Sequence, residues 1–239
     1  LRRYAAASVL RCSPLNRALC IFEENRVKNL FSEFDIDLGE VKQHYQERKI
    51  VSKQLRKLLE QHEVQDYCEL AVGVSDIHGN YSAYEHQLGP RILENNSYES
   101  IFNLAKLLSE KSITSRSVAK SIYESNLPYL KIGVGSEMAC MLQPKRLWVG
   151  NVRTIWCHLV VKHHGNWQTA NEELALYRFD DTSSEMHYKI WRDIYSSMKE
   201  DLDTIYELSL GWAEEQGVKV GKKKYLWVDA ICSALYACE

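Results

Sequence analysis

Arg153 and His158 are the two residues whose types and spacing could act together on a phosphodiester. They lie five positions apart in residues 150–167 (GNVRTIWCHLVVKHHGNW), a stretch without any acidic residue. A guanidinium can hold the scissile phosphate and stabilise the charge that it gains in the transition state. An imidazole titrates near neutrality, so it can move the proton of a ribose 2′-hydroxyl or of the leaving group. The pair therefore suggests cleavage of RNA without a metal ion.

The pattern Arg153-x4-His158, at the start of an expected helix, resembles the motif of HEPN-type ribonucleases. The resemblance implies an all-helical homodimer that cleaves RNA at a shared cleft and needs no metal or other cofactor. It assigns catalytic roles to Arg153 and His158 alone. The family often has Asn, Asp or His directly after the arginine, where this chain has Thr154. Residues five apart on a regular helix diverge by about 140°, so convergence requires a loosened first turn or a partner subunit.

Residues 138–171 lack Asp and Glu altogether. The chain has 32 acids among 239 residues, so about five would be expected in this window. Residues 171–216 compensate with an excess of acids, and this polarisation can create a local positive surface. Basic side chains interleaved with tryptophans are typical of surfaces that clamp single-stranded nucleic acid. The residues predicted to contact RNA or another nucleic acid are Lys145, Arg146, Lys162, His163, His164, Trp148 and Trp167.

Helices are the elements expected to position these side chains. Four prolines and eleven glycines in the whole chain favour long helices over a fold with many turns. The central helix should begin after Asn151, a good N-cap, and end before Gly165, a typical C-terminal glycine. Apolar residues at helical spacing predict further helices over residues 2–34 (broken near Pro14), 40–64, 98–110, 114–125, 171–178, 184–216 and 225–238.

These patterns predict an all-α fold, a bundle of about eight to ten helices. The one short segment that could form β structure is the apolar run over residues 68–80. We expect a single domain over residues 1–239, and a division into an N-terminal helical part (1–90) and a C-terminal bundle (91–239) is the alternative.

Composition excludes several classes of protein. Hydrophobic residues make up 45% and charged residues 26%, and the net charge of −2 provides no global field that would select a partner. The seven cysteines form no CxxC pair, which favours reduced thiols in the cytoplasm and argues against a metal site. No apolar run approaches 18 residues, so no membrane partner is expected.

Three other motifs have simpler interpretations. Asp76-x-His78-Gly79-Asn80 resembles the opening motif of calcineurin-like metallophosphoesterases, but the later metal-binding motifs of that family are missing, which favours a polar turn. The basic face of residues 40–64 and the run of lysines at 222–224 could each contact phosphates. A solvated helix face and a solvated loop are the simpler accounts.

The leading hypothesis is a helical protein that associates with nucleic acid, as a metal-independent endoribonuclease or as a binding protein that does not cleave. The alternative is a helical adaptor that binds another protein and catalyses nothing.

Overall fold

The computed structural model describes residue 34, residues 36–177 and residues 185–238, with the backbone alone for 185–191. Within these ranges it contains eleven α-helices, one 3-10 helix and no β-strand, so the predicted all-α fold is confirmed. The helix expected over residues 2–34 lies outside the described residues. The first elements are α3 (Leu38–Gln61), α4 (Val64–Ala71), η1 (Ile77–Gly79), α5 (Tyr81–Glu85), α6 (Leu88–Asn95) and α7 (Tyr98–Ser109). The later ones are α8 (Ser115–Glu124), α9 (Ile132–Leu142), α10 (Val152–Lys162), α11 (Trp167–Ala175), α12 (Glu185–Glu215) and α13 (Lys224–Ala237).

The apolar run over residues 68–80 is not a β-strand. Its first residues complete α4, where Tyr67, Cys68, Leu70 and Ala71 are buried at the spacing of one helix face. The remainder is a turn followed by the short helix η1. Three short helices in this region, α4, α5 and α6, raise the number of helices above the predicted eight to ten.

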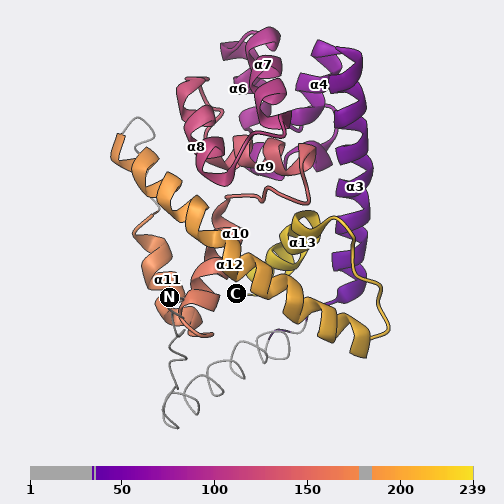
Figure 1. The fold of residues 1–239 in the computed structure, drawn as a ribbon, viewed down its shortest axis with the longest axis vertical. Helices are drawn as coiled ribbons and strands as arrows, with labels where there is room; N and C mark the ends of the chain where they lie inside the picture. The colour runs from indigo at the N-terminus through magenta and orange to yellow at the C-terminus, as the bar shows by residue number, and fades with distance from the viewer. Residues whose placement is uncertain (1–33, 35, 178–184, 239) are drawn as a thin grey trace, which may run out of the picture.

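Two long helices frame the molecule. Figure 1 shows α3 running along one edge while α12 crosses the bundle diagonally. Helix α3 packs against α4, α9 and α13, whereas α10 packs against α11, α12 and α13. The buried hydrophobic residues from Ile36 to Leu235 form one cluster that includes residues on both sides of position 90. Helices from both ends of the sequence therefore share one core.

Helix α10 begins and ends where the sequence predicts. Asn151 accepts a hydrogen bond from the backbone N–H of Thr154, and the Thr154 hydroxyl accepts one from Asn151 N, which makes a capping box. The helix stops at Lys162, and Gly165 follows with a φ of 82° and donates its N–H to the Val160 carbonyl. Thr154, which departs from the ribonuclease motif, thus serves to start the helix.

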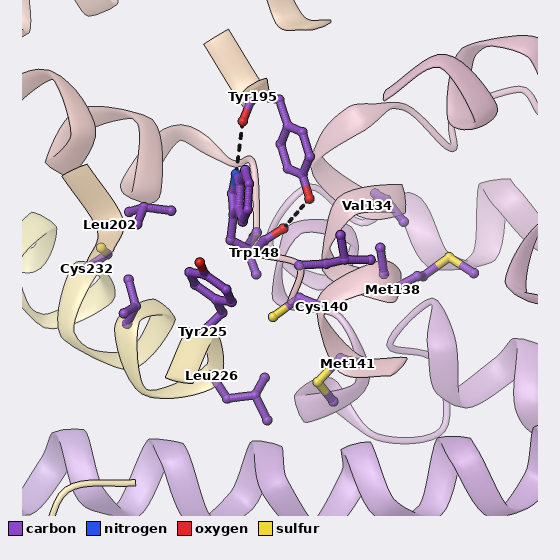
Figure 2. Packing of buried hydrophobic residues seen from close by; sticks show 14 of the residues in the cluster. Val134, Met138, Cys140, Met141, Trp148, Tyr195, Leu202, Tyr225, Leu226 and Cys232 are labelled. Atoms are coloured by element: carbon purple, nitrogen blue, oxygen red, sulfur yellow. Dashed lines mark hydrogen bonds between the residues drawn. The ribbon is translucent and has the colours of Figure 1, made fainter. Parts of the chain in front are cut away.

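Trp148 lies in the hydrophobic core, contrary to the prediction that it contacts nucleic acid. Its ring stacks on Tyr195 with 5.0 Å between centroids, and its Nε1 donates to the Tyr195 carbonyl at 3.1 Å. The Tyr195 hydroxyl donates in return to the Trp148 carbonyl at 2.9 Å (Figure 2). Since the indole is 1% exposed, it has no face on which a base could stack. The free energy gained by burying this large aromatic ring favours a place for Trp148 in the core over one at the protein surface.

A buried ionic network joins distant parts of the chain. The fully buried guanidinium of Arg48 contacts Glu137 at 2.7 Å, Asp229 at 3.4 Å and the His78 carbonyl at 2.9 Å. Burial alone would lower the pKa of Arg48, but the charges of Glu137 and Asp229 raise it. Glu137 also accepts the backbone N–H groups of Tyr81 and Ser82, which begin α5. This network holds α3, α5, α9 and α13 in one arrangement.

Two further observations concern membrane-spanning helices and the state of the cysteines. Among the described helices, none has the length and apolar character needed to cross a membrane. The described cysteines are free thiols: Cys68, Cys140, Cys157 and Cys232 are buried and Cys238 is exposed.

Candidate functional site

Arg153 projects from the first turn of α10 toward α5. Its Nη1 lies 2.6 Å from Oε1 of Glu85, and its guanidinium carbon lies 6.0 Å from the centre of the Tyr81 ring. The side chain is 14% exposed, and its buried Nε has no hydrogen-bond partner among the described residues. Arg153 is therefore already paired with a carboxylate at the position where a phosphate was expected.

His158 projects from the same helix toward α12. Its Nδ1 lies 2.6 Å from Oδ2 of Asp201, and its side chain is 7% exposed. The other ring nitrogen, Nε2, lies 3.5 Å from the hydroxyl of Ser197. Because α10 is regular from its capping box onward, the divergence of about 140° between Arg153 and His158 is retained. Within one chain the two side chains contact different helices, so the expected shared site is not formed.

The basic end of α10 is neutralised by the acidic residues that follow it. Lys162 and His163 each lie 2.6 Å from the carboxylate of Glu173 on α11, and Tyr177 donates its hydroxyl to the same group. Burial by itself would raise the pKa of Glu173, but hydrogen bonds from Lys162, Tyr177 and His163 lower it to about 2. Two of the residues predicted to contact nucleic acid thus form an intramolecular ion-pair group.

The remaining predicted contacts lie in different places. Arg146 donates to the Gln143 side chain and to the Ile113 carbonyl, which ties its turn to the start of α8. His164 has a φ of 53° in the turn after α10, and Trp167 is half exposed at the start of α11. Lys145 is exposed beside Arg146. Of this set, Lys145 joins a larger group of positive charges.

The structure brings the lysines at 222–224 and α3 close to Lys145. The backbone N–H of Tyr225 donates to the Pro144 carbonyl at 2.9 Å, which places the start of α13 beside the 143–146 turn. The backbone N–H of Lys223 donates to the Tyr45 hydroxyl at 3.2 Å, which places the same segment against α3. Three segments separated by about 75 to 180 residues in sequence therefore meet here, as the helical bundle closes.

We name Lys49, Arg56, Lys145 and Lys223 the basic patch. Burial lowers the pKa of Lys223, and the charges of Arg56, Lys145 and Lys49 lower it further, so each of these three cations is near enough to Lys223 to repel it. The exposed residues Lys42, Lys53 and Lys57 extend the patch along one face of α3, within an arc of roughly 100°.

No member of the basic patch forms an ion pair with a carboxylate in the part of the chain that the structure describes. Lys49 lies over the Tyr45 ring at 6.0 Å, and Arg56 Nε donates to the Ser52 carbonyl. The patch differs in this respect from Arg153, Lys162 and His163, each of which contacts Glu85 or Glu173. Unpaired cations at a surface attract a partner that carries several negative charges.

Asp76 and His78 form a polar turn, which is the simpler of the two interpretations of the Asp-x-His-Gly-Asn motif. Asp76 accepts the backbone N–H of His78 as the N-cap of η1, and its carboxylate lies 2.8 Å from the ring Nδ1. The other ring nitrogen pairs with Glu47 on α3 at 3.0 Å. No group of three or more His, Cys, Asp or Glu side chains that could hold a metal ion is found among the described residues.

Comparison with known proteins adds no relative: no protein-family model, no curated protein and no solved structure matches this chain. Its function has to be inferred from its own residues.

Proposed function

We propose that the protein binds nucleic acid by its phosphate backbone, at the basic patch. The observation that carries the proposal is the convergence of Lys49, Arg56, Lys145 and Lys223 from three separate segments. The support comes from charge, because these four cations lack carboxylate partners within the described residues. Exposed aromatic rings are not part of the patch, so we expect phosphate contacts without base readout.

The physics of this interaction predicts a strong dependence on salt. Each phosphate that the protein neutralises releases condensed counterions, which favours binding at low ionic strength. For single-stranded nucleic acid, four contacts give a slope of log K against log salt of about −3. Affinity should depend little on sequence, since phosphates are the same at every position.

The test compares two triple variants with the same change in net charge. Lys49→Gln, Lys145→Gln and Lys223→Gln remove one cation from each segment of the patch, whereas Lys111→Gln, Lys120→Gln and Lys131→Gln remove exposed lysines elsewhere. Fluorescence anisotropy of a labelled 20-nucleotide RNA, and of DNA of the same sequence, measures binding at several salt concentrations. We expect the patch variant to bind at least tenfold more weakly with a slope of about −1, and the control variant to bind like the wild type.

Two outcomes would contradict the proposal. Equal losses in both variants would mean that overall charge, not the patch, governs binding. Absence of affinity for RNA and DNA at low salt would favour the alternative, a helical adaptor that binds another protein.

The initial hypothesis also included cleavage of RNA and assembly as a homodimer. Arg153 contacts Glu85 on α5 whereas His158 contacts Asp201 on α12, so the two side chains share no site within one chain and we do not propose cleavage by it. Incubation of labelled RNA in EDTA, with Arg153→Ala and His158→Ala as comparisons, tests it directly. Light scattering after size exclusion tests the homodimer. The free thiols of the described cysteines support a reducing location such as the cytoplasm.

A further inference from the structure

The hydrogen bond between His158 and Asp201 fixes the position of the imidazole. The Asp201 carboxylate lies 2.6 Å from Nδ1, and a carboxylate there keeps the proton on this nitrogen. The opposite nitrogen, Nε2, then carries a lone pair that can accept a proton. The His158 side chain is 7% exposed, so the surrounding protein holds the imidazole in one orientation.

Ser197 is the side chain that Nε2 faces. Its hydroxyl lies 3.5 Å from Nε2 and donates to the Ile194 carbonyl at 2.9 Å. Ser197 and Asp201 are four residues apart on α12, so both lie on the face that meets α10. His158 is thus placed between a hydroxyl and a carboxylate, one on each ring nitrogen.

Ser197 also borders a hollow that opens to solvent. The hollow has a volume of about 570 Å³ and is lined by Arg116 from α8 and by Arg192, Asp193, Ser196 and Ser197 from α12. Arg192 pairs with the adjacent Asp193, an exposed contact that contributes little stability. Two guanidinium groups beside a hydroxyl suit a small molecule that carries a negative charge.

We propose that Ser197, His158 and Asp201 form a nucleophile, a general base and a positioning carboxylate, which hydrolyse a carboxylic ester bearing an anionic group. Arg116 and Arg192 bind the anionic group and bring the ester carbonyl to Ser197. This site shares no residue with the basic patch, so the inference does not rest on the nucleic-acid proposal.

The reaction needs only the ester and water. Ser197 Oγ attacks the carbonyl carbon, and its proton passes to Nε2 of His158. Collapse of the tetrahedral intermediate breaks the ester bond, and the departing alkoxide takes that proton, which leaves an acylated serine. Water then attacks the acyl carbon and gives a proton to His158, which returns it to Ser197 as the carboxylic acid leaves.

The geometry sets three requirements for the reaction with a bound substrate. The separation of 3.5 Å exceeds the 2.6–3.2 Å of a working proton transfer, and such bonds often shorten only when substrate binds. The Ser197 hydrogen must also turn from the Ile194 carbonyl to Nε2. Backbone N–H groups near Ser197 are used within α12, so the guanidinium groups must stabilise the oxyanion.

Ser196 provides a matched control. It lines the same hollow one residue away, but its hydroxyl donates to the Arg192 carbonyl. A fluorophosphonate probe should form an adduct at Ser197, located by peptide mass spectrometry, in the wild type and in Ser196→Ala. Ser197→Ala should form no adduct and should lose at least about 100-fold in the hydrolysis of 4-nitrophenyl hemisuccinate. Both variants should keep the wild-type helicity, because both sites accept a helix-forming residue.

The roles of the other groups are tested separately. Asp201→Asn should lower kcat without changing KM, and Asp201→Glu should recover part of the loss, whereas a merely structural role would reduce stability and spare kcat. Arg116→Gln with Arg192→Gln should lower kcat/KM for both esters, because the guanidinium groups stabilise the oxyanion, but the loss should be about tenfold larger for the hemisuccinate than for the neutral 4-nitrophenyl acetate, because they also bind its anionic group.

Three results would overturn the inference. They are an unlabelled Ser197 in the folded wild type, full hydrolysis by Ser197→Ala, and an equal effect of Ser196→Ala. Identical losses for the anionic and neutral esters in the arginine variant would reject the anionic substrate.

Discussion

At the scale of single residues, several basic side chains and histidines of residues 138–171 are paired with carboxylates that the fold brings against them. Arg153 contacts Glu85, His158 contacts Asp201, and Lys162 contacts Glu173. Each carboxylate comes from another helix, and in the sequence it lies 11 to 68 residues away. The local excess of positive charge is therefore largely compensated around α10, while the basic patch on the α3 side is not.

Glu173 gives a prediction with a defined pH dependence. Its pKa falls from the ordinary 4.5 to about 2 in the folded protein, so its stabilisation is complete above pH 4.5 and is lost between pH 4.5 and pH 2. Glu173→Gln should lower the free energy of unfolding by about 2 kcal/mol at pH 7. The difference from the wild type should shrink as the pH falls to 3, as measured by urea unfolding. Glu172→Gln, at the exposed neighbouring position, should change stability little at either pH.

At the scale of elements, close contact between helices depends on particular small residues. The Asp-x-His-Gly-Asn motif has a packing role, because Gly79 in η1 lies directly against α4. A Cβ atom at this position would lie 1.7 Å from the Leu70 carbonyl oxygen. The glycine of the motif is thus explained by backbone contact between two elements, with Asp76 and His78 completing the turn.

Two glycine substitutions should have opposite effects. Gly79→Ala should destabilise the protein by about 3 kcal/mol, since the backbone of α4 cannot yield as a flexible side chain would. Gly211→Ala should stabilise it by about 0.5–1 kcal/mol, because Gly211 lies inside α12 with nothing within 4 Å of the added atom. Thermal and urea unfolding measure both. Similar effects in the two variants would contradict the packing role of Gly79.

At the scale of the whole molecule, one ionic network joins residues 181 positions apart. Arg48 near the beginning of the described chain contacts Asp229 near its end, and Arg48 also contacts Glu137 and the His78 carbonyl from the middle. Such a network is costly to bury and becomes very unfavourable when one partner is removed. It makes the arrangement of α3, α9 and α13 specific, while the hydrophobic cluster around it supplies most of the stability.

Removal of Arg48 is therefore expected to lower the stability of the whole fold. Arg48→Ala should lower the free energy of unfolding by about 3–5 kcal/mol, because Glu137 and Asp229 stay buried without a counter-charge. The triple variant Arg48→Met, Glu137→Gln and Asp229→Asn should lie closer to the wild type, since it buries no unpaired charge. Denaturant unfolding followed by circular dichroism measures both. A triple variant less stable than Arg48→Ala would contradict this account.

Local patterns in the sequence were sufficient for the helices. Apolar spacing and caps predicted α3, α7, α8, α10, α12 and α13, with α10 beginning at its Asn151 cap. The segment 64–95 was less predictable, because its helices are short and because Gly79 and Gly89, which look like turn signals in the sequence, lie inside η1 and α6 and allow close packing there. Helix propensity and periodicity are properties of neighbouring residues, which explains why the long elements could be recognised.

The tertiary structure decided which residues make up the candidate sites. The sequence by itself determined an all-helical chain whose bases and acids are concentrated in different segments. Only the fold decided that Asp201 and Glu173 neutralise α10, that Trp148 is buried, and that Lys145 joins Lys223 and α3. The physical reason is range: a helix forms from contacts within a few residues, whereas charge pairing and burial depend on which helices pack together.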